Sequence, residues 1–212
     1  MMLSEIGIGV YYQSVVGDNE ARLKDTFRTA IDRADVVVAC GGLGPTEDDL
    51  TRESIADVLG LPLRRNDEWE RRLRAFFEQV RRNRPGTGAF PENNLRQAMV
   101  PDGATLLPNQ RGTAPGIYLE HDGKTVILVP GPPREMRGLM HDEVIPRLKQ
   151  KLERSGTDGV LVSRILRVYG VGESRIAELL RDVLDRQTNP TIAPLAQAGE
   201  VHLRITAHAA ES

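Results

Sequence analysis

Short apolar runs recur along the chain and predict β-strands. Val36–Cys40 and Val126–Val129 are continuous apolar runs, a pattern typical of strands buried on both faces of a parallel sheet. The segment Val10–Val16 is rich in valine and tyrosine, and we predict a further strand there. Gly116–Glu120 and the apolar run after it flank residues 121–123, whose Asp-Gly pair predicts a β-hairpin.

Between these runs, apolar residues recur with the spacing of amphipathic helices. The predicted helices begin after Asp18 or Asn19, at Thr51 and near Asp67, which are residue types that cap helix N-termini. Strands that alternate with helices predict an α/β fold. The apolar faces comprise Leu23, Phe27, Ala30 and Ile31 in the first helix, Ile55, Val58 and Leu59 in the second, and Trp69, Leu73, Phe76, Phe77 and Val80 in the third.

The C-terminal part of the chain has its own pattern. A strand is predicted over Val160–Tyr169, a helix over Glu173–Arg186 and an alternating strand over Glu200–Ala207. The polar, glycine-containing segment at 154–159 predicts a domain boundary. The expected domains are 1–153 and 160–212.

Composition narrows the range of functions. The formal net charge of −2 argues against a general nucleic-acid binder, which usually carries a basic excess. Cys40 is the single cysteine, so an intrachain disulfide and a cysteine-based zinc site are excluded. No apolar run approaches the length of a membrane span, and the first ten residues do not resemble a signal peptide. We therefore expect a cytoplasmic protein with neither a membrane nor a nucleic acid as its partner.

The glycine-rich segment Gly41–Glu53 is the strongest candidate for chemistry. It follows the predicted strand Val36–Cys40, and its glycines let backbone N–H groups approach a ligand closely, at the sheet edge where α/β proteins bind ligands. Glu47, Asp48 and Asp49 would repel a phosphate unless a divalent metal neutralised them, and such a metal could also activate water. The alternative is a solvated acidic turn ahead of a helix.

Three further segments are weaker candidates. Gly112–Pro115 consists of small residues that either leave room for a ligand or form a tight turn. Gly131–Glu135 follows a buried strand and opens a helix, so its N–H groups either face an anion or belong to a rigid turn. Residues 93–97 carry amides, among them those of Asn94 and Gln97, and the Arg96 guanidinium; these groups suit sugar hydroxyls and phosphate, or they simply lie on an exposed helix face.

Together these segments resemble the CinA-like (competence/damage-inducible protein A) family. GGLGPTEDDLTRE, which starts at Gly41, is similar to that family's signature loop, a variant of the loop in molybdopterin-binding domains of the MoaB and MogA type. The resemblance continues in order and spacing and covers nearly the whole chain. The other matching segments are VVGDNEARL, NLRQAMVPDGATLLPNQRGTAPG, VPGPPREM, GVGESRIAELL and NPTIAPLAQAGEVHLRITA.

The resemblance implies a three-layer α/β domain with a mostly parallel sheet, followed by a small KH-like α+β region. It also implies a homo-oligomer and ADP-ribose pyrophosphatase activity with a divalent metal. Our main expectation is therefore metal-dependent hydrolysis of a nucleotide-sugar pyrophosphate of the ADP-ribose type, with Asp48 and Asp49 as catalytic and metal-binding residues. The alternatives are a pterin- or nucleotide-binding module without catalysis and an inactive remnant.

The expected site combines the four segments around a nucleotide-type small molecule. Its ligand-binding residues are Gly41, Gly42, Leu43, Gly44, Pro45, Thr46, Asn94, Gln97, Gly112, Thr113, Ala114, Pro115, Gly131, Pro132, Pro133 and Glu135.

Two departures from the family pattern modify these expectations. The family normally begins with a strand and a helix ahead of the part that matches Leu3–Val10. Without that strand, Val10–Val16 and Val36–Cys40 should have unpaired edges or pair with each other, and hydrolysis should be poor. Full-length members often add a nicotinamide-mononucleotide deamidase domain, which we do not find here, so we expect no deamidase activity.

Overall fold

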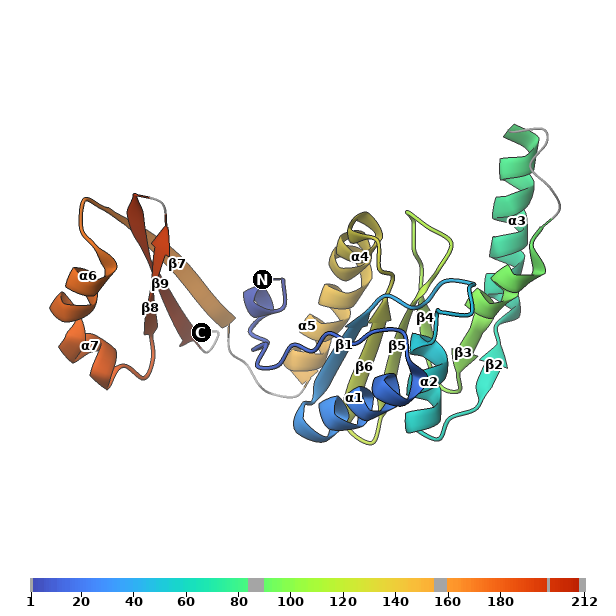
Figure 1. Ribbon diagram of the computed structural model, residues 1–212, viewed down its shortest axis with the longest axis horizontal. Helices are drawn as coiled ribbons and strands as arrows, with labels where there is room; N and C mark the ends of the chain where they lie inside the picture. Colours follow the sequence, from blue (N-terminus) through green and yellow to red (C-terminus); the bar gives the residue numbers. More distant parts are fainter. Residues whose placement is uncertain (1, 84–89, 155–159, 198, 210–212) are drawn as a thin grey trace. The chain divides into compact units, whose positions relative to one another are not determined.

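The computed structural model describes residues 2–83, 90–154, 160–197 and 199–209 (Figure 1). It divides into two compact units, one formed by Gln13–Pro146 and the other by Met1–Tyr12 with Arg147–Ser212. The boundary predicted at 154–159 falls almost entirely outside the described residues. No helix in the described part of the chain is long and apolar enough to span a membrane.

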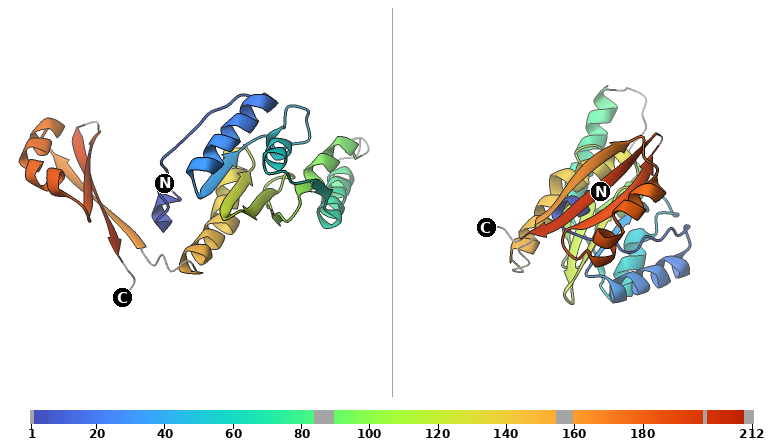
Figure 2. Two further views of the ribbon diagram at one scale, coloured as in Figure 1. Left: turned by 90° about the horizontal axis from the view of Figure 1, so that it is seen from below. Right: turned by 90° about the vertical axis from the view of Figure 1, so that its left-hand side faces the viewer.

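A mixed four-stranded sheet organises the unit Gln13–Pro146. Its strand order is β1-β6-β5-β4, in which β1 and β6 are parallel and the other neighbours are antiparallel. Helices α1 and α2 cover one face and α4 covers the other, which gives three layers (Figure 2). The predicted α/β class is confirmed, but the sheet is mixed and not mostly parallel, because hairpin-type pairing makes β5 antiparallel to both β6 and β4, and among the described residues only β1 and β6 pair in parallel. The bounds are α1 (Glu20–Arg33), β1 (Val36–Cys40), α2 (Thr51–Val58), β4 (Thr105–Leu107), β5 (Gly116–His121), β6 (Lys124–Val129) and α4 (Pro133–Leu139).

The core of this unit joins the apolar faces predicted for α1 and α2 to one face of the sheet. Leu23 and Phe27 of α1 and Ile55 of α2 are buried against the strands, where Ile117 and Leu128 are 2% and 1% exposed. Burial of such side chains is the main favourable term in folding. The apolar spacing therefore identified the faces that hold the carboxyl end of the sheet in place.

The hairpin predicted at residues 121–123 is confirmed. His121 pairs with Lys124, and the residues between them, Asp122 and Gly123, have φ values of 46° and 76°. Two successive positive φ values are typical of the two-residue turns that Asp-Gly favours. The turn sets the antiparallel register of β5 and β6.

The strand predicted over Val10–Val16 is absent, so that prediction was wrong. The segment pairs with no strand in the described chain, and Tyr11 and Val15 are 86% and 96% exposed. Residues that favour strands form one only where a neighbour satisfies their backbone N–H and C=O groups. Among the described residues β1 has β6 as its one sheet neighbour, which leaves the open edge that we expected on β1.

A smaller sheet and two helices adjoin the central sheet. β2 (Leu63–Arg65) and β3 (Met99–Pro101) pair antiparallel, and both went unpredicted because three-residue strands carry little periodicity. α3 (Asp67–Asn83) follows β2, and a 3-10 helix, η2 (Glu92–Ala98), precedes β3.

The C-terminal unit contains a three-stranded antiparallel sheet with the order β7-β9-β8. A further strand, β8, lies between the predicted helix Glu173–Arg186 and the predicted strand Glu200–Ala207, and that helix is divided at Leu180. β8 contains Pro194, which cannot donate to a ladder, and β8 lies at the edge of the sheet, where proline is tolerated. The remaining bounds are η1 (Ser4–Ile6), the π-helix η3 (Met140–Val144), α5 (Ile145–Arg154), β7 (Val160–Tyr169), α6 (Glu173–Leu179), α7 (Arg181–Arg186), β8 (Thr191–Gln197) and β9 (Glu200–Ala209).

Candidate functional site

The two glycine loops meet at the carboxyl ends of β1 and β6. These parallel strands end together, since Cys40 is paired with Val129 and the N–H of Gly41 donates to the Val129 carbonyl at 2.9 Å. A Cβ atom added to Gly131 would lie 3.4 Å from the Gly41 Cα, so the two backbones are in contact distance. Backbone from two segments is therefore exposed at the sheet edge where α/β proteins bind ligands.

Positive φ angles shape the first loop. Gly41 and Gly42 have φ values of 99° and 67°, and a Cβ atom on Gly42 would lie only 2.1 Å from the Thr51 Oγ1. Leu43 turns inward and is 2% exposed, which anchors the loop in the core. The loop thus requires glycine for its conformation as well as for any approach to a ligand.

Asp49 holds the acidic part of this loop together through hydrogen bonds within the loop. Its Oδ2 accepts hydrogen bonds from the Thr46 hydroxyl and from the Thr46 backbone N–H, the latter at 2.9 Å. Partial burial acts to raise the pKa of Asp49, but the hydrogen bonds from Thr46 and Gly44 outweigh it and hold the pKa below its usual value. Asp48, in contrast, is exposed and has no hydrogen bond or ion pair among the described residues.

An ionic cluster of the buried Arg52 with the half-buried Glu53 and Arg96 supports the loop. Arg96 of η2 donates to the Thr46 and Asp49 carbonyls and to Glu53 Oε1, the last at 3.0 Å. Arg52 is 1% exposed and lies 3.2 Å from the same carboxylate oxygen, and burial lowers the pKa of its guanidinium. Sequence reasoning missed Arg52 and Glu53 because arginine and glutamate are ordinarily surface residues.

Asn94 and Gln97 are both buried, unlike residues of an exposed helix face. The Asn94 amide donates to the Pro91 carbonyl at 3.0 Å, so it closes its own turn. Gln97 is 2% exposed, and its Oε1 has no hydrogen-bond partner within the described residues. Of the two predicted ligand-binding amides, Gln97 keeps an unpaired acceptor, but this oxygen is buried and is not exposed to a ligand.

The segment Gly112–Pro115 packs against the start of α4. Asn109 Nδ2 donates to the Ala114 carbonyl at 2.9 Å and to Glu135 at 2.7 Å. A Cβ atom on Gly112 would lie 2.1 Å from the Glu135 carboxylate, so glycine is needed for this contact. Ala114 and Pro115 are buried.

The start of α4 offers fewer N–H groups than predicted. Pro132 and Pro133 carry none, and the N–H groups of Glu135 and Met136 both donate to the Pro132 carbonyl. The structure therefore brings all four predicted segments to one end of the sheet, with Gly131 as the exposed glycine between them.

Two cavities adjoin these loops. The larger, about 440 Å³, lies along the open edge of β1 beneath α1 and reaches Gly41 and Gly42. The smaller, about 190 Å³, lies between α3 and residues 108–113. Among the described residues, no three histidine, cysteine, aspartate or glutamate side chains gather in a way that could hold a metal ion.

Comparison with known protein families identifies both parts of the chain. Residues 1–150 match the family described as "Probable molybdopterin binding domain", and residues 163–212 match the "Damage-inducible protein CinA KH domain". The chain belongs to the CinA-like group of the molybdopterin-binding domain family.

Similar proteins bear related names. This CinA-like chain is 45% identical over 209 residues to a competence-damage inducible protein of Bacillus subtilis strain 168, covering 99% of the chain and 48% of the relative. It is 49% identical over 210 residues to the protein of that name in Symbiobacterium thermophilum, covering 99% of the chain and 47% of the relative. A solved CinA structure of unknown function from Thermoplasma acidophilum is 31% identical, with a TM-score of 0.49, over 65% of this chain and 72% of that one. The chain spans about half the length of the curated relatives it matches.

These findings correct the main functional expectation. The matching family is described by molybdopterin binding, and the relatives bear no hydrolase name, so the predicted ADP-ribose pyrophosphatase activity is wrong. Adjacent carboxylates misled the prediction, because their spacing in sequence does not reveal that Asp49 is engaged by Thr46. The alternative reading, a binding module of the pterin type, agrees better with the family.

Proposed function

We propose that this CinA-like chain is a module that binds a molybdopterin-type pterin without transforming it. The observation that carries the proposal is the contact between Gly41 and Gly131 at the ends of two parallel strands, in a member of the molybdopterin-binding domain family. A molybdopterin-type ligand carries a terminal phosphate, and exposed backbone of glycine-rich loops is a common phosphate cradle. We assign the phosphate to these loops and the ring to the side of Gly112 and Thr113.

An ion pair beside the glycine loop supports the binding proposal. The Arg96–Glu53 pair holds the loop rigid, which reduces the entropy cost of binding.

We further propose that a divalent cation, if present, binds together with the ligand phosphate. Asp49 is already engaged within the loop, so Asp48 is the carboxylate that remains available. Magnesium in proteins is often held by one or two carboxylates together with phosphate oxygens, and this arrangement needs no cluster of three protein ligands. The expected self-association and lack of nucleic-acid binding stay predictions.

Isothermal titration calorimetry tests the binding proposal. The probe is the phosphate ester of 6-hydroxymethylpterin, titrated into the full chain with and without Mg²⁺, and AMP is the comparison ligand. We expect saturable binding of the pterin ester that is about tenfold tighter than that of AMP, which corresponds to ~1.4 kcal/mol. Absence of binding heat from the pterin ester, or tighter binding of AMP, would overturn the proposal.

A further inference from the structure

One edge of β1 carries backbone groups that the described chain leaves unpaired. The Asp35 carbonyl accepts a hydrogen bond from β6 at 2.8 Å, and the Gly41 N–H donates one to β6 at 2.9 Å. In a parallel ladder, alternate residues of a strand bond to the same neighbour, so the residues between them point their N–H and C=O groups toward the open edge. These residues are Val36, Val38 and Cys40, and on that side none of them has a backbone partner among the described residues.

The larger cavity, of about 440 Å³, runs along this open edge. Its walls are residues 37–42, the apolar face of α1 and residues 13–16. Asp18 is the one charged side chain among the described residues that line it. A space that combines apolar walls with unpaired backbone groups suits a β-strand, because a strand supplies both apolar side chains and a complementary row of N–H and C=O groups.

The chain itself contains a segment with the properties of such a strand. Val10–Val16 is rich in valine and tyrosine and has no charged residue, which matches the nearly uncharged walls of the cavity. Its residues Tyr11 and Val15 are 86% and 96% exposed, and it pairs with no strand among the described residues. At ~3.3 Å per residue the segment spans about 23 Å, which is enough to cover the whole of β1.

Within one molecule the segment does not complete the sheet. Residues 13–16 line the same cavity as β1 but form no ladder with it. The end of the segment is fixed, because Val16 packs against the core and Asn19 caps α1 by accepting from the Arg22 N–H at 3.1 Å. The strand that satisfies the β1 edge therefore comes from a second copy of the chain, whose own segment is equally exposed.

We propose that two copies of the chain exchange this segment, each placing its Val10–Val16 along the open edge of the other's β1. The exchanged strand pairs with the unpaired backbone groups of β1 and buries its apolar side chains in the cavity. Reciprocal exchange of one element between identical chains gives a closed, symmetric dimer. The inference goes beyond the proposed ligand and does not depend on it. Because the cavity reaches Gly41 and Gly42, the exchanged strand lies beside the candidate site.

Sedimentation equilibrium and hydrogen–deuterium exchange of the full chain test the exchange together. Over a wide range of concentrations the mass should rise from that of one chain to twice that value. The amides of Val36, Val38 and Cys40 should become protected as the dimer forms, whereas those of Val37 and Ala39, which bond to β6, should be protected throughout. A monomer at every concentration, or edge amides that are already protected in the monomer, would overturn the proposal.

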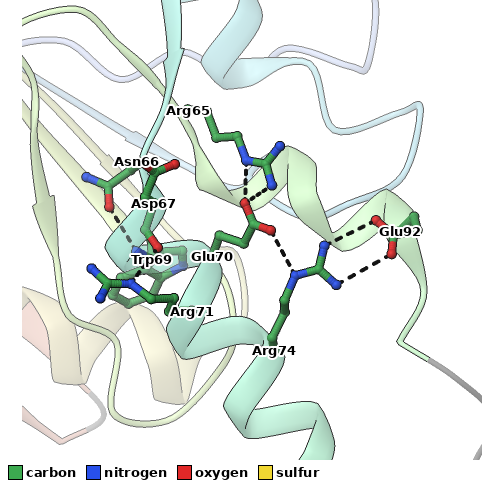
Figure 3. Close-up of polar contacts among 8 residues, drawn as sticks. All are labelled: Arg65, Asn66, Asp67, Trp69, Glu70, Arg71, Arg74 and Glu92. Carbon is green, nitrogen blue, oxygen red and sulfur yellow. Dashed lines mark hydrogen bonds and ion pairs between the residues drawn. The ribbon is translucent and has the colours of Figure 1, made fainter.

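A pair of lysine variants separates strand exchange from general apolar association. Val15→Lys should raise the dissociation constant of the dimer by about tenfold or more, because the exchanged strand would carry a charge into an apolar cavity. The matched control is Phe76→Lys, at an apolar position of α3 that is 47% exposed, and it should leave the dissociation constant unchanged. The first turns of α3 are held by Glu70, which accepts from both Arg65 and Arg74, so the control keeps its fold (Figure 3).

Two proline variants test the backbone pairing itself and decide the question should Val15→Lys fail to fold. Successive N–H groups of a strand point to opposite sides, so either Ser14→Pro or Val15→Pro removes a donor to β1 whatever the register. We expect at least one of them to raise the dissociation constant about tenfold, with the circular dichroism of the monomer unchanged, because neither N–H has a backbone partner among the described residues. A dimer that Val15→Lys and both prolines leave intact, or that Phe76→Lys weakens equally, would show that the copies associate through another surface.

Discussion

At the residue scale, Asp48 and Asp49 are adjacent carboxylates with opposite surroundings. Asp49 accepts hydrogen bonds from Thr46, and its pKa is lowered, whereas Asp48 is exposed and engages no described residue. One residue is therefore a support of the loop and the other is free to meet a cation with the ligand. The arrangement therefore does not provide the two equivalent metal-binding carboxylates that the sequence pattern indicated.

Replacement of each residue by alanine should separate these roles. Asp49→Ala should lower the free energy of unfolding at pH 7 by about 1–2 kcal/mol, because the Thr46 donors lose a charged acceptor. Asp48→Ala should change it by less than about 0.5 kcal/mol. Urea denaturation measures both, and equal stability of the two variants would show that the Asp49 hydrogen bonds do not hold the loop.

The same pair predicts a pH dependence. The folded chain lowers the pKa of Asp49, so its stabilising contribution is complete above the unfolded value of about 3.9 and is lost as pH falls through the folded pKa. The stability difference between the parent and Asp49→Ala should therefore shrink in acid, while that for Asp48→Ala stays near zero. A difference that grows as pH falls below 4 would contradict this assignment.

At the element scale, η2 is tied to the signature loop through Arg96. Its guanidinium donates to the Thr46 and Asp49 carbonyls and pairs with Glu53 of α2, so one side chain joins three segments. Backbone carbonyls that are held in this way keep the loop in a single conformation. The 3-10 helix η2 thus contributes to the site mainly by holding the signature loop in position.

Arg96→Leu should loosen the loop without unfolding the sheet. We expect a loss of about 2 kcal/mol of stability from the broken charged hydrogen bonds. We also expect faster hydrogen–deuterium exchange at residues 46–51. Arg22→Leu, at an exposed position on α1, is the control and should leave exchange there unchanged. Unaltered exchange in Arg96→Leu would show that the loop is rigid for another reason.

How far sequence predicts these elements depends on whether the deciding interaction is local. The apolar face of α1 and the buried Trp69 and Leu73 of α3 follow from helical spacing, although Phe76 of the predicted α3 face is exposed. The Asp122-Gly123 turn follows from its two residue types. Val10–Val16 has the composition of a strand but pairs with no strand among the described residues, and β8 contains a proline that its edge position allows. The buried Arg52 and the engagement of Asp49 depend on residues that fold against them, so neither could be read from spacing.

At the scale of the whole molecule, the chain consists of two compact units, and every residue of the proposed site lies in the unit Gln13–Pro146. The chain spans about half the length of its curated relatives, so no activity of those whole proteins is transferred to it. Family membership and the geometry of the site together support our proposal that a pterin binds at the carboxyl ends of β1 and β6.

Calorimetry on a pair of glycine variants tests this claim most directly. Gly131→Ala places a methyl group 3.4 Å from the Gly41 Cα, an ordinary contact that the fold tolerates but that fills the phosphate cradle. Gly17→Ala is the matched control, since a Cβ atom there meets nothing within 4 Å. We predict that Gly131→Ala weakens binding of the phosphate ester of 6-hydroxymethylpterin by about tenfold or more, with little effect on the free pterin, and that Gly17→Ala changes neither. Equal affinity of both variants and the parent for the phosphate ester would contradict the assignment of the phosphate to the glycine loops.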